Sequence, residues 1–175
     1  ITYNDNQKCA IKKAITDNLL VITGGPGTGK TTLIKAIIDI YADINSYSYE
    51  DLKNNLALLA PTGRAAKRMS ENTSLPAYTI HRFLKWNKEL NTFQINEHNK
   101  SSVKFVIIDE VSMIDTLLLE SLLRGLNRDI KLVIVGDYNQ LPSVGPGQVL
   151  KDVIDSKVTD IVYLDLLYRQ NSESY

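Results

Sequence analysis

The chain has 175 residues, 43% of them hydrophobic, which is enough to bury the core of one α/β domain with a small insert. Its 20 basic and 20 acidic residues give a net charge of zero, so composition carries no overall nucleic-acid signature. The single cysteine, Cys9, excludes an internal disulfide and a cysteine-based metal site and favours a cytoplasmic setting, and no apolar run resembles a signal peptide or membrane span.

A helix is predicted near the beginning of the chain, where Ile11, Ala14 and Ile15 follow the 3.6-residue period. Gln7 stands three residues after Asn4, which is the spacing of a capping box. Position alone therefore slightly favours a capping role for Gln7. The alternative that stays open is contact with the edge of an adenine ring, from just before the first strand.

The strongest motif lies between a predicted strand at residues 19–23 and an apolar-periodic helix. It fits G-x-x-x-x-G-K-[ST], in which glycines let backbone N–H groups point at phosphate oxygens and the helix adds its positive dipole end. Lys30 can reach the β- and γ-phosphates, and Thr31 can place its hydroxyl on Mg²⁺. The residues predicted to bind a nucleoside triphosphate are Gly25, Pro26, Gly27, Thr28, Gly29, Lys30, Thr31 and Thr32.

A second buried strand is predicted at residues 56–60, followed by Pro61-Thr62-Gly63-Arg64 and a helix. Thr62 is a natural helix N-cap, and a helix start beside Arg64 is also able to hold a phosphate of a nucleic-acid strand. Six basic residues against one acid between residues 61 and 88 fit such a patch, although a solvated helix face would give the same pattern.

The segment at residues 77–86 is predicted to be a short amphipathic helix that leaves Thr79 and His81 available for polar contacts. Taken alone, His81 is more commonly a structural side chain than a ligand. Residues 87–100 are polar, and the alternation at residues 92–95 predicts a small exposed hairpin.

Residues 105–108 are a continuous apolar run, as expected for a strand buried on both faces of a parallel sheet. The run ends in Asp109 and Glu110, and open α/β sheets bind ligands at the carboxyl ends of such strands. Asp109 can hold Mg²⁺, and Glu110 can orient or deprotonate an attacking water. The pair would otherwise merely cap the next helix, but the phosphate loop in the same chain favours catalysis.

The last predicted strands cover residues 131–135 and 160–164. Gln140 lies in the loop after the first of them, where its amide is able to bond a γ-phosphate, the attacking water, or simply the backbone of the turn. Arg169 lies just beyond the second and is a candidate arginine finger. The elements together predict an α/β fold, a mostly parallel five-strand sheet with helices on both faces.

Six sequence blocks, from one end of the chain to the other, carry a resemblance to a known family. They are GGPGTGKTT (24–32), APTGRAAKRM (60–69), TIHRFL (79–84), IIDEVSMID (107–115), GDYNQLPSVGPGQVL (136–150) and YRQ (168–170). These blocks resemble the RecD-type superfamily 1 DNA helicases, the exodeoxyribonuclease V alpha-subunit family and its stand-alone relatives. The resemblance implies a RecA-like P-loop NTPase sandwich, with the strand before Gln140 lying between the phosphate-loop strand and the Asp109 strand.

The resemblance also implies an ATP-driven motor that moves 5′-to-3′ on single-stranded DNA and unwinds duplex DNA in recombination and repair. It assigns Gln7 to adenine, and Gln140 and Arg169 to the γ-phosphate. It assigns Mg-ATP hydrolysis to Lys30, Thr31, Asp109 and Glu110. DNA contacts would come from Thr62, Gly63, Arg64, Thr79 and His81. Residues 86–104 would include a short hairpin insert that acts as a strand-separating pin.

A helicase motor needs two RecA-like lobes, so residues 1–175, which begin at Ile1 without methionine, are expected to be the first lobe of a larger protein. Alone, they are expected to hydrolyse ATP slowly or not at all. The expected partners are single-stranded DNA, DNA junctions, the second lobe and RecB- or RecC-like subunits. Two alternatives stay open. One is another P-loop ATPase of the AAA+ DNA-processing type. The other is a nucleotide-gated DNA-binding module without catalysis, and the presence of Glu110 and Gln140 argues against this second alternative.

Overall fold

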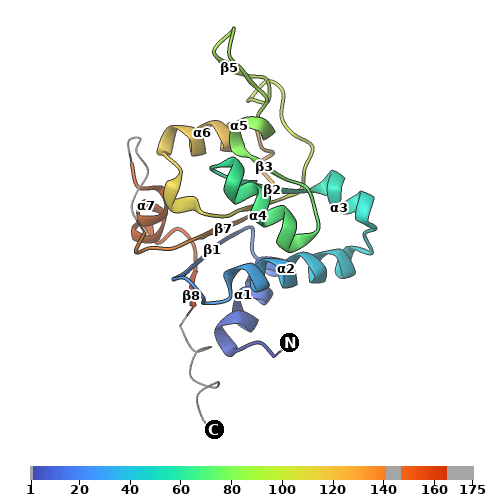
Figure 1. Cartoon of the computed structure of the whole chain (residues 1–175), viewed down its shortest axis with the longest axis vertical. Coiled ribbons are helices and arrows are strands. Elements are labelled where there is room, and N and C mark those ends of the chain that lie inside the picture. Colours follow the sequence, from blue (N-terminus) through green and yellow to red (C-terminus); the bar gives the residue numbers. More distant parts are fainter. Residues whose placement is uncertain (1, 141–146, 165–175) are drawn as a thin grey trace.

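Six parallel strands form the central sheet of the computed structural model, which describes residues 2–140 and 147–164 (Figure 1). Their spatial order is β3 (Ala77–Thr79), β2 (Leu56–Ala60), β6 (Phe105–Ile108), β7 (Lys131–Gly136), β1 (Leu19–Gly24) and β8 (Ile161–Leu164). The strand β7 lies between β1 and β6, as the resemblance implies. The RecA-like α/β prediction is therefore confirmed.

Helices cover both faces of this sheet, and the two faces take helices from different parts of the chain. One face carries α1 (Asp5–Thr16), α2 (Lys30–Asn45), α3 (Tyr49–Asn55) and α4 (Gly63–Thr73). The other carries α5 (Ile80–Phe83), the 3-10 turn η1 (Val111–Met113), α6 (Thr116–Arg124) and α7 (Val149–Ser156). Within the described residues, no helix is long and apolar enough to cross a membrane.

Alternating side chains of the central strands supply the two apolar cores. In β1, Leu20 and Ile22 pack toward α1 and α2, whereas Val21 packs toward the opposite helices. All four residues of β6 are fully buried, which explains the uninterrupted apolar run in the sequence. The buried strands give the sheet a rigid carboxyl edge, at which the functional side chains stand.

The sheet has a sixth strand that the five-strand prediction missed, and the helix predicted at residues 77–86 is shorter than expected. Ala77–Thr79 forms β3, which pairs in parallel with Leu58–Ala60 of β2. Only the four residues of α5 are helical, and Trp86–Asn87 begins a hairpin. The backbone groups on the open side of β2 provided pairing partners for β3, and this long-range pairing outweighed the local helical period.

Short elements also form in two polar regions of the chain, at residues 49–55 and 86–93. The region of residues 41–55, interpreted as a helix end and a surface connection, contains α3, whose capping box joins Ser48 and Asp51. The predicted hairpin is present: β4 (Trp86–Asn87) pairs antiparallel with β5 (Thr92–Phe93). In Figure 1 it projects away from the sheet, near the top of the view.

Candidate nucleotide and DNA site

The predicted phosphate loop connects β1 to α2 at the carboxyl edge of the sheet. Gly29 has a φ of 85°, a left-handed conformation that favours glycine, and it precedes the first helical residue, Lys30. The buried Thr28 hydroxyl donates to the Gly25 carbonyl at 2.8 Å. No side chain caps the first turn of α2 within the described residues, which leaves its N–H groups available to an anion at the loop.

The Lys30 ammonium group folds back over this loop. Its Nζ donates to the carbonyls of Gly24 and Gly25, the second of these at 3.1 Å. Backbone carbonyls are weaker partners for an ammonium group than phosphate oxygens, because they carry no net charge. The same side chain is therefore placed to exchange these carbonyls for an anion at the loop.

Gln7 is 2% exposed and makes the capping box that its spacing predicts. The Asn4 N–H donates to Gln7 Oε1 at 3.0 Å, and the Gln7 N–H donates to Asn4 Oδ1 at 2.8 Å. The nitrogen of the same amide group meets the phosphate loop, since a Cβ added at Gly29 would lie 2.8 Å from Gln7 Nε2. Capping therefore holds the Gln7 amide against the loop. The adenine contact stays a prediction.

Asp109 and Glu110 follow β6 directly and lie at the same edge as the phosphate loop. The Asp109 N–H donates to the Leu59 carbonyl at 2.9 Å, and its Oδ1 accepts from the Glu110 N–H at 2.8 Å. Burial raises the pKa of Asp109 above its usual range, and the neighbouring charge of Glu110 adds to this rise. The Glu110 N–H and the charges of Lys30 and Arg68 oppose it.

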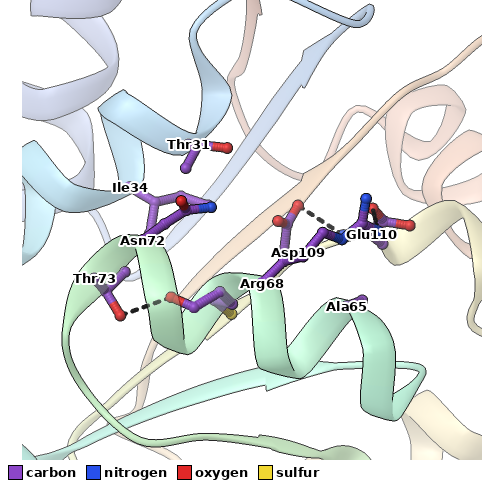
Figure 2. A pocket seen from close by; sticks show the side chains of 9 residues that line it. Thr31, Ile34, Ala65, Arg68, Asn72, Thr73, Asp109 and Glu110 are labelled. Carbon is purple, nitrogen blue, oxygen red and sulfur yellow. Dashed lines mark hydrogen bonds and ion pairs between the residues drawn. The ribbon is translucent and has the colours of Figure 1, made fainter.

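A recess of about 440 Å³ lies between α2, α4 and the end of β6. Figure 2 shows Thr31 on one side of it, Asp109 and Glu110 on another, and α4 running along it. The residues that α4 contributes recur at intervals of three and four: Ala65, Arg68, Met69, Asn72 and Thr73. Two predicted Mg²⁺ ligands, Thr31 and Asp109, are thus brought to one recess.

Arg68 also belongs to this recess, and sequence reasoning counted it only as part of a basic cluster. Its Nη2 lies 3.1 Å from Glu110 Oε1, an ion pair across 42 positions of sequence. The one available signal was spacing, because Arg68 follows the buried Ala65 by three residues and so borders the buried face of α4.

Gln140 stands at the same sheet edge but does not line this recess. Its Oε1 accepts from the Ser112 hydroxyl at 3.4 Å, and its N–H donates to the Asp137 carbonyl at 3.1 Å. It lines a separate recess of about 280 Å³ with Ser112 and Lys151. Arg169, the predicted arginine finger, lies outside the described residues.

The predicted DNA-contacting residues follow two adjacent strands. Thr62, after β2, caps α4 by accepting from the Ala65 N–H at 3.2 Å, and Gly63 and Arg64 are exposed in the first turn of that helix. Thr79, at the end of β3, caps α5 in the same way through the Arg82 N–H. Because β2 and β3 are parallel, both helix starts lie at the edge that carries the phosphate loop.

His81 is exposed and belongs to an aromatic cluster that the sequence did not predict. Its ring centroid lies 6.3 Å from that of Trp86 and 5.8 Å from that of Phe93, and these two rings lie 4.8 Å apart. The hairpin brings Trp86 and Phe93 together as directly paired residues. Trp86 is 37% exposed, so the cluster presents aromatic surface to solvent.

Comparison with known proteins agrees with these features. A family model described as AAA domain matches residues 7–146. The chain belongs to the AAA domain family. This AAA domain is 35% identical over 166 residues to the RecBCD enzyme subunit RecD of Buchnera aphidicola subsp. Schizaphis graminum, covering 85% of the chain and 27% of that relative.

It is also 34% identical over 171 residues to the ATP-dependent RecD2 DNA helicase of Deinococcus radiodurans, covering 98% of the chain and 22% of that relative. The AAA domain thus spans about a quarter of the length of these relatives. Among solved structures, the Pif1 helicase of Candida albicans has a TM-score of 0.67 at 26% identity, covering 94% of the chain and 40% of that protein. The resemblance to RecD-type helicases is confirmed.

Proposed function

We propose that the chain is the first RecA-like lobe of an ATP-dependent DNA helicase. The observation that carries the proposal is the meeting of Thr31 and Asp109 in one recess beside the phosphate loop. This arrangement requires β1, β7 and β6 to stand side by side, and that strand order is observed. The RecD2 relative is named an ATP-dependent DNA helicase, and the RecD relative a subunit of the RecBCD enzyme.

The nucleotide would lie on the loop between β1 and α2. Backbone N–H groups and Lys30 would hold the phosphates, and Gln7 would meet the adenine. The donor set of Thr31 and Asp109 fits Mg²⁺, which prefers hydroxyl and carboxylate oxygens. When bound, Mg²⁺ neutralises charge on the phosphates. Glu110 would accept a proton from the attacking water.

We further propose that Gln140 and Arg169 contact the γ-phosphate once a second RecA-like lobe completes the site. The support for a second lobe is the length of the relatives, of which this chain matches about a quarter. Isolated residues 1–175 would then bind nucleotide weakly. Assembly with RecB- or RecC-like subunits, a cytoplasmic setting and a role in recombination and repair follow from the same likeness to RecD.

Single-stranded DNA would cross the carboxyl ends of β2 and β3. Its phosphates would meet the first turn of α4, at Thr62, Gly63 and Arg64, and the start of α5, at Thr79. His81 and the adjoining Trp86 offer an exposed aromatic surface on which a base can stack. The hairpin beyond them would separate the strands of a duplex at a junction.

The deciding experiment is ATP hydrolysis by the full native protein that contains this chain, with and without single-stranded DNA. Hydrolysis is expected to rise strongly with DNA and to fall by about a hundredfold or more in Lys30→Ala, because the phosphate charge loses its cation. Hydrolysis that depends on Lys30 but is indifferent to DNA would contradict the helicase proposal. It would favour a P-loop ATPase of another class.

A further inference from the structure

Glu110 is held by a partner from a different element, although its proposed role requires a free carboxylate. Arg68 Nη2 on α4 meets Glu110 Oε1 at 3.1 Å, and the side chains are 60% and 28% exposed. An ion pair that remains accessible to solvent is weak and easily exchanged. Another anion can therefore take the place of Glu110 at the Arg68 guanidinium.

The backbone at Glu110 has an uncommon conformation. Its φ of 54° and ψ of 40° place it in the left-handed region, which is unfavourable for a residue with a side chain. The Glu110 N–H is at the same time committed to Asp109 Oδ1. The two neighbouring carboxylates differ in their ion pairing. Asp109 forms no ion pair among the described residues, whereas Glu110 forms one with Arg68.

The helix α4 connects this ion pair with the proposed DNA contact. Arg64, in its first turn, and Arg68 are four residues apart and are neighbours along the helix surface. Arginine binds phosphate as a two-pronged donor, so a DNA phosphate at the beginning of α4 is a strong competitor for the Arg68 guanidinium.

We propose that Arg68 is a positioning residue that restrains Glu110 while DNA is absent. A DNA phosphate that takes the guanidinium would free the Glu110 carboxylate to accept a proton from the attacking water. The inference rests on the proposed function, and it explains why hydrolysis would wait for DNA. It concerns the rate of the chemical step and leaves nucleotide binding unchanged.

The test is ATP hydrolysis by the full native protein carrying Arg68→Ala, first without DNA. The DNA-free kcat is expected to rise by up to about fivefold, the factor that corresponds to about 1 kcal/mol for an exposed ion pair. KM for ATP should stay the same, and the ratio of the DNA-stimulated to the DNA-free rate should fall. Arg68→Lys keeps a cation and should retain most of the restraint.

Arg124→Ala is the matched control, because it removes another exposed Arg–Glu ion pair, with Glu120 in α6, away from the site. It should leave all rates unchanged. A DNA-free rate in Arg68→Ala that equals or falls below that of the unmodified protein would overturn the restraint. Absence of DNA stimulation in the unmodified protein would instead contradict the proposed function, and the DNA-free comparison would still test Arg68.

Discussion

The nucleotide edge and the hairpin region of this domain are built from elements of very different length. The nucleotide edge stands on β1, β6 and β7, strands of four to six residues that are buried almost throughout. The hairpin region stands on α5, β4 and β5, which have four, two and two residues. Long buried strands hold polar groups in place, whereas the short elements are held by packing of Ile80, Leu84 and Phe93 against the edge of the core.

The two regions also differ in what they present to a ligand. The nucleotide edge offers backbone N–H groups, an ammonium group and two carboxylates beside a recess. The hairpin region offers three aromatic rings in mutual contact. The first suits a compact anion with a cation, and the second suits the flat face of a base.

The largest effect is expected from Phe105→Ala in β6. Phe105 is fully buried and its ring lies 4.7 Å from that of Tyr41, so the change should lower the free energy of unfolding by about 3–5 kcal/mol. Phe93→Ala in the hairpin should cost less than half as much, since Phe93 is only half-buried. Chemical denaturation measures both losses in the free energy of unfolding. Equal losses would show that the two regions contribute equally to stability.

An intermediate effect is expected from Trp86→Ala, and it should appear in DNA binding. Loss of a stacked aromatic ring should weaken binding of single-stranded DNA to the full native protein by about 1–3 kcal/mol. Trp86→Phe should keep most of the affinity, because the aromatic face remains. Fluorescence anisotropy with a labelled oligonucleotide measures this, and unchanged affinity in Trp86→Ala would remove the cluster from the DNA path.

A smaller effect is expected at Thr62, where the two regions adjoin. Thr62→Ala removes the hydrogen bond to the Ala65 N–H and should lower the free energy of unfolding by about 1 kcal/mol. Thr62→Ser keeps the hydroxyl and should lie close to the unmodified chain. Thermal unfolding distinguishes them, and a similar loss in both variants would mean that the methyl group matters more than the cap.

The smallest effect on stability, and a gain, is expected from Asp109→Asn. Burial raises the pKa of Asp109, so the folded state takes up a proton at a higher pH than the unfolded state does. The unmodified chain therefore loses stability as pH rises through this raised pKa. Asp109→Asn should be slightly more stable at pH 7.

The gain should shrink as pH falls toward the ordinary range of aspartate, at about pH 4. Denaturation of both chains at several pH values measures it. The opposite trend, a gain that grows in acid, would mean that Asp109 is stabilised by its charged neighbours more than it is destabilised by burial. Mg²⁺-dependent nucleotide binding should be lost in the same variant.

The sequence by itself determined the features that depend on neighbouring residues. The phosphate loop, the Asn4–Gln7 capping box and the Thr62 cap were all predicted, and the structure contains both caps. The buried strands β1, β2, β6 and β7 were predicted by their apolar runs. Caps and apolar runs arise from interactions within a few residues, so their signals are local.

Only the tertiary structure decided which distant groups meet. It paired Ala77–Thr79 with the open edge of β2, placed Arg68 against Glu110, and gave Gln140 the Ser112 hydroxyl in a separate recess. It also gathered His81 with the hairpin rings. The first three contacts join groups whose separation in space is set by the order of strands in the central sheet, which local sequence does not record. The ring cluster instead depends on the pairing register of the hairpin, in which Trp86 lies opposite Phe93.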